Sequence, residues 1–168
     1  MSNYQQVKRM INYGDKLIFN LAGEHIGIDV ASIKDIVEVE RFLPLPISLP
    51  LILGIINRHG ELITVAELSA LIRLHSVKSE PPYRVVIIEE GNTTIGVSVG
   101  AGNMYFLWKE DIAKGDISPV SQNDYFKAII TMDDVSIRLL DCSQIIEGVE
   151  KAVRECNITL SVFSPVYH

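Results

Sequence analysis

The chain has 168 residues, 48% of them apolar, and a net charge of −6 at pH 7. That length suits one domain, or two small subdomains around one core. The negative charge argues against a nucleic-acid partner, because such affinity depends on Lys and Arg side chains that neutralise phosphates. The longest uncharged run, residues 42–57, contains three prolines and is shorter than the about 20 residues of a membrane-spanning helix.

The N-terminal residues and the cysteines bear on the cellular location. The first residues lack the apolar core of a signal peptide. Two cysteines, Cys142 and Cys156, are too few for a disulfide framework, so we expect reduced thiols. These features predict a cytoplasmic protein that does not insert into a membrane. Residues 1–13 are expected to be an extension, in which Val7, Met10 and Ile11 have helical spacing over a run too short to be stable alone.

Short strands rich in Ile, Val and Leu follow one another through the first half of the chain. Turns at Ala22-Gly23-Glu24 and His59-Gly60-Glu61 separate them. The predicted strands are residues 16–21, 26–30, 36–40, 51–57 and 62–64. Leu68, Leu71 and Ile72 then have the spacing of one helical face, which predicts a packing helix within residues 65–74.

The second half repeats this order after Ser79-Glu80-Pro81-Pro82, where a proline pair interrupts regular structure. We expect the two halves to join near residues 76–83. The predicted strands are residues 84–89, 94–99, 104–108, 126–132 and 135–140. Ile145, Ile146, Val149 and Val153 predict a helix, which ends a main domain of residues 14–154. In the tail, residues 155–168, alternating Ile158, Leu160 and Val162 predict a strand, with terminal disorder as the alternative.

The two halves share sequence as well as order. Residues 26–30 return sixty-nine positions later as residues 95–99, with a glycine at the same phase, and residues 51–67 lie over residues 125–141. Chance is the alternative explanation, because all strands draw on the same few residue types. Two copies are too few for a solenoid. The repeat therefore predicts two related halves packed as one all-β body.

A search for chemical motifs finds almost nothing. The four histidines and two cysteines lack the spacing of metal ligands. The glycine-rich stretch 96–102 follows a strand without opening a helix, as a phosphate-binding loop would. The acidic pairs Glu89-Glu90 and Asp133-Asp134 lie at predicted turns, where acidic residues are common. We therefore expect no enzymatic activity, no cofactor and no metal site.

An ordered series of motifs resembles the CheW-like domain of bacterial chemotaxis. Residues 19–30 read F-x-L-x-G-E-x-x-G-I-D-V, prolines follow at Pro46 and Pro50, and residues 54–68 read GIINRHGELITVAEL. The resemblance covers about residues 14–150. It implies two intertwined, pseudo-repeated subdomains, each a five-stranded SH3-like β-barrel, that share a core and carry short helices, one of them near the C-terminus.

The resemblance also implies a function. Members of this family are non-enzymatic adaptors that couple the cytoplasmic tips of chemoreceptors to a CheA-like histidine kinase. The contacts are between barrels for the kinase regulatory domain and between a groove and a helix for the receptor. Such a protein would be cytoplasmic and recruited to membrane-bound receptor arrays. Self-association stays open.

By the same resemblance, two groups of residues are candidates for these contacts. The receptor-groove candidates are Asn57, Arg58, His59, Gly60 and Gly100. The kinase-contact candidates are Ile36, Leu43, Pro44 and Leu45. A charged residue in place of Ile36 or Leu43 is expected to weaken kinase binding without unfolding the protein.

Some positions depart from the family pattern. His59 stands at the position of a characteristic arginine, and histidine lacks the permanent charge and five-donor fork of arginine. Gly100 replaces a common aspartate, and Gly102 and Tyr105 replace aliphatic residues. These departures keep two alternatives open. One is a scaffold in a motility or other signalling array without a standard receptor; the other is an enzyme or small-ligand binder that uses the cleft between the barrels.

Overall fold

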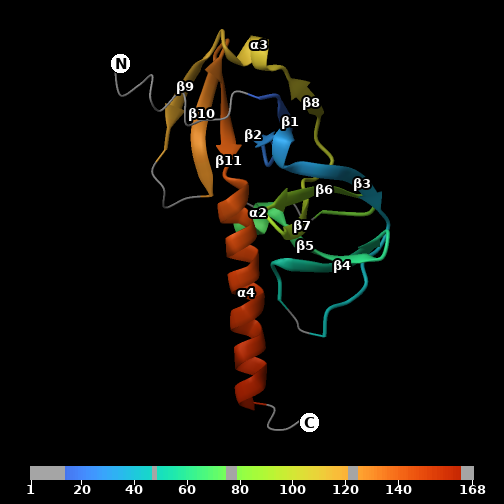
Figure 1. The fold of residues 1–168 in the computed structure, drawn as a ribbon. Helices are drawn as coiled ribbons and strands as arrows, with labels where there is room; N and C mark the ends of the chain where they lie inside the picture. The colour runs from blue at the N-terminus through green and yellow to red at the C-terminus, as the bar shows by residue number, and fades with distance from the viewer. Residues whose placement is uncertain (1–13, 47–48, 75–78, 121–124, 164–168) are drawn as a thin grey trace.

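The computed structural model describes residues 14–46, 49–74, 79–120 and 125–163, with side chains described up to residue 156. The predicted N-terminal extension and residues 76–78 of the predicted join lie outside this part. Two curled β-sheets form the body, and a long C-terminal helix runs from the end of one sheet alongside the other (Figure 1).

The described chain contains eleven strands and a few helices. The strands are β1 (Lys16–Leu21), β2 (Glu24–Asp29), β3 (Ile33–Val39), β4 (Ile52–Arg58), β5 (Glu61–Glu67), β6 (Tyr83–Glu90), β7 (Thr93–Ser98), β8 (Met104–Leu107), β9 (Asp116–Pro119), β10 (Phe126–Met132) and β11 (Val135–Leu140). The helices are the 3-10 turn η1 (Val30–Ser32), α2 (Leu68–Leu71), α3 (Lys109–Ile112) and α4 (Cys142–Phe163). All ten predicted strands are present, and β9 is an additional one.

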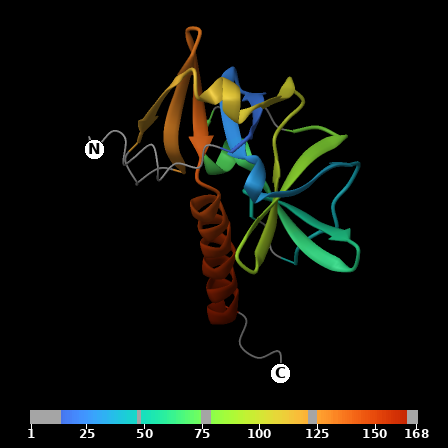
Figure 2. The same ribbon diagram turned by 45° about the horizontal axis from the view of Figure 1, so that its top comes forward.

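The all-β fold in two subdomains is confirmed, with a different distribution of strands. One sheet has six strands in the order β8-β1-β2-β11-β10-β9, and the other has five in the order β3-β6-β7-β5-β4 (Figure 2). The prediction of five strands in each subdomain is therefore wrong for the first sheet. β9 accounts for the difference, because it extends that sheet beyond β10.

The two halves of the sequence do not form separate sheets. The hairpin β1-β2 from the first half pairs in parallel with β11 from the second, and the hairpin β6-β7 from the second half pairs in parallel with β5 from the first. The repeat thus has a structural meaning, because the orders β1-β2-β11-β10 and β6-β7-β5-β4 are equivalent. The described part of the predicted join, residues 79–82, leads from β5 to β6 of the same sheet. It therefore connects the two halves of the sequence and does not link one subdomain to the other.

The core explains why the first strand is apolar on both faces. Leu17 and Phe19 pack into the main cluster, which also includes residues of the five-stranded sheet and of α4. Ile18, which lies between them, packs into a second cluster with Ile117 and Ile137. Successive side chains of a strand point to opposite faces, so a strand buried on both sides needs a continuous apolar run.

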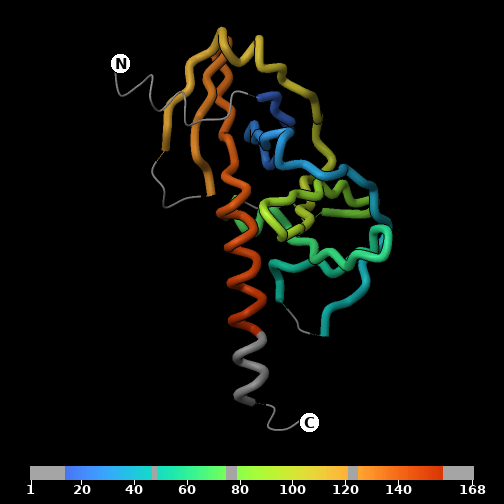
Figure 3. The backbone as a smooth tube through the Cα atoms, viewed as in Figure 1, coloured from blue at the N-terminus to red at the C-terminus, as the bar shows by residue number. Residues whose placement is uncertain are grey.

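Helix α4 begins at a side-chain cap and is longer than predicted. The N–H of Gln144 donates a hydrogen bond to Oδ1 of Asp141 at 3.2 Å, which is a typical N-terminal cap. Ile145 and Val149 bury one face of the helix in the main cluster. The helix continues to Phe163, so the strand predicted for the tail is wrong. Figure 3 shows the path of the backbone from β11 directly into this helix.

Candidate protein-interaction site

Four of the five receptor-groove candidates form the tip of the β4-β5 hairpin. Asn57 and Arg58 end β4, and His59 and Gly60 form the turn, with φ angles of 53° and 84°. A two-residue turn with positive φ at both positions matches the twist of the flanking strands. Oδ1 of Asn57 accepts a hydrogen bond from the N–H of Gly60 at 3.0 Å. The exposed imidazole of His59 is therefore carried on a well-defined turn.

Arg58 is held by an ion pair that the sequence does not reveal. Its guanidinium donates to the carboxylate of Asp35 in β3, so it contacts the opposite edge strand of the same sheet. The N–H of Ile36 and the Arg58 guanidinium hold the pKa of Asp35 below its ordinary value. This contact brings the two edges of the five-stranded sheet together beside the turn.

A second group of ion pairs lies next to this contact. Nζ of Lys34 lies 3.0 Å from Glu61 and 3.1 Å from Glu89. Hydrogen bonds to these two carboxylates raise the pKa of Lys34. We call Lys34, Asp35, Arg58, Glu61 and Glu89 the ion-pair corner. The turn at His59 therefore lies beside paired charges, the nearest of them made by the neighbouring Arg58.

The structure does not bring Gly100 together with this turn. The turn lies before β5, whereas Gly100 follows β7, and the two strands run parallel with Val65 opposite Gly96. The length of β7 therefore separates them. Gly100 has a φ of 74° and lines a cavity of about 700 Å³ between the β1-β2 turn and residues 79–84. The five receptor-groove candidates belong to two places on the molecule.

The wall of this cavity contains a buried polar network. The Ser79 hydroxyl donates to Oε1 of Glu67 at 2.7 Å, and the Ser98 hydroxyl donates to Oγ of Ser79 at 3.1 Å. Burial raises the pKa of the Glu67 carboxyl group. Arg84, which also lines the cavity, donates a hydrogen bond to the backbone oxygen of Gly102 at 2.6 Å.

Close packing explains why residue 102 is a glycine. A Cβ atom at this position would lie 2.5 Å from the backbone oxygen of Asn20. The close approach of the β1-β2 turn therefore excludes the aliphatic residue that the family pattern places here. The departure at Gly102 therefore follows from the close packing of the segment before β8 against β1.

The kinase-contact candidates differ in exposure. Leu43 is 55% exposed, and its N–H and C=O form a pair of 2.8 Å hydrogen bonds with Ile55 of β4. Pro44 next to it is exposed, and Leu45 is partly buried. Ile36 in β3 is partly buried and packs against the main core cluster. A charge at Ile36 would disturb that core, so the expectation of an intact fold is reasonable at Leu43 and not at Ile36.

An aromatic surface on the edge strand β8 was missed as a site. Tyr105, Phe106 and Trp108 are all about half exposed, and the rings of Phe106 and Trp108 stack with centroids 5.9 Å apart. The available signal was three aromatic residues within four positions of a predicted strand. Only the replacement of an aliphatic residue at Tyr105 was noticed from the sequence.

The described residues lack both a cluster of metal ligands and a membrane-spanning helix. Across these parts of the chain, no three His, Cys, Asp or Glu side chains gather as metal ligands would. None of the described helices combines the length and the apolar character needed to cross a bilayer.

The exchanged hairpins and curled sheets define a two-subdomain β fold. The family model described as CheW-like domain matches residues 15–150, and the chain therefore belongs to the CheW-like domain family. The fold is also similar to the crystal structure of the scaffolding protein TtCheW from Thermoanaerobacter tengcongensis. That match has a TM-score of 0.63 and 23% identity, and covers 76% of this chain and 88% of that chain. The comparison with curated proteins gave no match.

Proposed function

We propose that this chain is a non-enzymatic signalling adaptor that couples chemoreceptor cytoplasmic helices to the regulatory domain of a CheA-like histidine kinase. Membership of the CheW-like family is the observation that carries the proposal. The fold similarity to a protein described as a scaffold agrees with it. The adaptor would work in the cytoplasm, at membrane-bound receptor arrays.

The kinase contact is proposed at Leu43, Pro44 and Leu45, together with Ile36 of β3. Leu43 is apolar, more than half exposed and fixed by two backbone hydrogen bonds to β4. A rigid, exposed apolar side chain costs little entropy on binding and gains by burial. It is therefore suited to anchor a homologous barrel.

The receptor contact is proposed at the turn of Asn57, Arg58, His59 and Gly60. Gly100 is proposed as a separate contact, because it lies at the other end of β7. A receptor helix that uses both would have to lie along the sheet. The ion pair between Arg58 and Asp35 favours the alternative of a scaffold in a motility or other array without a standard receptor, because it leaves the arginine engaged within the chain.

The test is a titration of the full chain with the regulatory domain of a CheA-like kinase from the same organism, and separately with a receptor cytoplasmic fragment. Leu43→Glu should weaken kinase binding at least about tenfold, as loss of a buried anchor does. Leu62→Glu is the matched control, since Leu62 is as exposed but lies on β5. Kinase binding without receptor binding would favour the alternative scaffold. Binding to neither partner would refute the proposal.

A further inference from the structure

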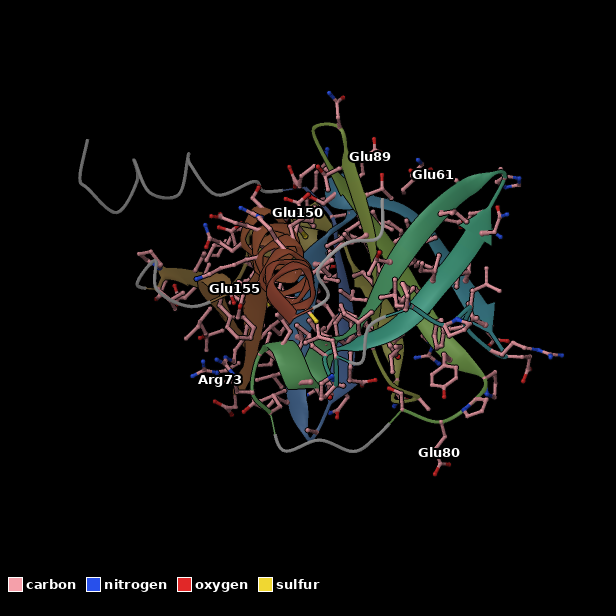
Figure 4. The ribbon with its side chains drawn as sticks, turned by 90° about the horizontal axis from the view of Figure 1, so that it is seen from below. Glu61, Arg73, Glu80, Glu89, Glu150 and Glu155 are labelled. Atoms are coloured by element: carbon pink, nitrogen blue, oxygen red, sulfur yellow. The ribbon has the colours of Figure 1, made fainter. Side chains whose placement is uncertain are left out.

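A groove lies between α4 and the five-stranded sheet, next to the ion-pair corner, because Leu62 on its sheet side follows Glu61 and is paired with Asn57. Its volume is about 320 Å³. The sheet side is formed by β5 and β7 and includes Leu62, and the helix side is formed by Val149, Glu150, Val153 and Arg154 of α4. Figure 4 looks along α4 and shows the helix end-on beside the sheet, with Glu61, Glu89 and Glu150 in the same upper part of the view.

Apolar side chains on both walls of the groove remain accessible. Leu62 is 65% exposed, which is the largest value among the exposed large apolar residues of the described chain. Val153 on the helix is partly exposed, and Val149 is buried beneath it. Removing such side chains from water is favourable, so the groove offers a site for an apolar surface that fits between sheet and helix.

The helix edge of the groove carries two opposite charges that are not paired within the chain. Glu150 and Arg154 are four positions apart and exposed. A glutamate and an arginine at this spacing commonly pair on a helix. Among the described residues, neither side chain takes part in an ion pair or a hydrogen bond. Both charges are free to meet another molecule.

We propose that a second copy of this chain packs its α4 antiparallel into this groove. Reversal of the helix places Glu150 of one copy against Arg154 of the second copy, and Arg154 against the second copy's Glu150. The two-fold axis then crosses α4 at the level of residue 152, midway along the helix between the two charged residues. The two-fold axis repeats the Glu150–Arg154 ion pair on both sides of the contact, as in an isologous dimer.

The same arrangement fills both grooves at once. In this arrangement the two α4 helices lie side by side, each still packed on its own sheet and in contact with the sheet of the other copy. Leu62 and Val153 of each copy face the helix of the other, so the exposed leucine is covered in both. A second copy is favoured as the occupant because α4 itself carries the reversed order of charges that the groove edge needs.

The test is sedimentation velocity of the full chain from micromolar to millimolar concentration. The parent chain should show a reversible monomer–dimer equilibrium. Leu62→Glu and Val153→Glu should each shift it to monomer, while Thr131→Glu, which adds the same charge at an exposed position of the six-stranded sheet, should leave it unchanged. Circular dichroism of each variant checks that the fold is retained.

A charge-swap series tests the antiparallel geometry. Glu150→Arg alone and Arg154→Glu alone each put like charges together twice, and should weaken association about tenfold. The double variant Glu150→Arg with Arg154→Glu should restore it. A parent chain that stays monomeric at all concentrations overturns the proposal. So does a dimer that survives Leu62→Glu and Val153→Glu, one that Thr131→Glu disrupts, or a double swap that fails to restore association.

Discussion

Gly27 and Gly96 occupy equivalent places in the two sheets. Each lies in the second strand of a hairpin that pairs in parallel with a strand from the other half of the chain, Gly27 opposite Leu139 and Gly96 opposite Val65. At each site an added Cβ would meet side chains of the neighbouring strands. These glycines let the exchanged hairpins fit closely against the sheets that receive them.

The two sites differ in how tightly they are packed, which gives a prediction. A Cβ at Gly96 would lie 2.8 Å from Cγ1 of Val85 and 3.0 Å from Cγ2 of Val65, whereas at Gly27 the nearest atom is Cδ1 of Ile18 at 3.1 Å. Valine is stiff, but the end of an isoleucine side chain can rotate away. Gly96→Ala should therefore lower the free energy of unfolding by about 1–3 kcal/mol, and Gly27→Ala by less. Urea denaturation measures both, and an equal or reversed ranking would contradict this explanation.

A buried ion pair at the start of β1 gives a second prediction. Lys16 is fully buried and contacts the carboxylate of Asp29, which also receives Lys127 from β10. Asp29→Asn leaves the Lys16 ammonium without that carboxylate in the interior. The variant should lose about 3–5 kcal/mol of unfolding free energy. Glu61→Gln, which breaks an exposed pair, should cost less than about 1 kcal/mol in the same denaturation assay.

The second half of the repeat suggests a double variant that should recover stability lost by replacing Asp29. In the second half, the positions that match Lys16 and Asp29 are Val85 and Ser98, which are opposite each other in the same way. The double variant Lys16→Val with Asp29→Ser should be more stable than Asp29→Ser alone, because no buried ammonium remains. Lys127 is 29% exposed at its side chain and can turn to water. A double variant less stable than the single one would show that the two sites are not equivalent.

The buried carboxyl group of Glu67 predicts a pH dependence of stability. Burial raises its pKa in the folded chain above the ordinary value of 4.5. Below 4.5 the group is protonated in both states, and its contribution to stability is full; as the pH rises through the folded pKa, that contribution is lost. Glu67→Gln keeps an acceptor for the Ser79 hydroxyl and does not titrate. The unfolding free energy of the variant minus that of the parent should therefore increase with pH above 4.5, and a flat difference would refute the assignment.

The cysteines should differ in reactivity. Cys142 is buried at the start of α4, and burial raises the pKa of its thiol to about 12. The thiolate is the reactive form, so Cys142 should not react with a thiol reagent at neutral pH. Cys156 is partly exposed. We expect one labelled thiol per native chain and two in denaturant, with Cys156→Ser removing the native signal. Labelling of Cys142 in the native state would contradict its burial.

The strands were predictable because their signal is local. Apolar runs such as Leu17–Leu21 and the turns between them are written within a few residues of sequence. The exchange of hairpins was not predictable, because the pairing of β2 with β11 joins residues more than a hundred positions apart. No local pattern records which strand lies beside which.

The tail shows how cooperativity overrides a short pattern. Ile158, Leu160 and Val162 alternate as in a strand, but the helix has already formed at the Asp141 cap and is packed through Ile145 and Val149. Extending a helix adds one hydrogen bond for each residue that is fixed, so it continues more easily than it starts. The alternation of three residues is therefore a weaker determinant than the extension of a helix that is already packed.

The candidate site was only partly predictable for a similar reason. The turn at His59 and Gly60 follows from local sequence. The ion pair of Arg58 with Asp35 depends on the curl of the sheet, which brings its two edge strands together. The separation of Gly100 from the turn depends on the parallel direction of β5 and β7. These are tertiary relationships that motifs do not encode.

The exchanged hairpins also bear on how a chain of this kind could arise. A protein consisting of one half alone would expose a hairpin whose pairing strand lies in another molecule. Two such molecules could complete both sheets only by interlocking, and their assembly would depend on concentration. Joining the halves through the segment around Ser79–Pro82 makes the partner strand permanently local, so its effective concentration no longer depends on how much protein the cell contains.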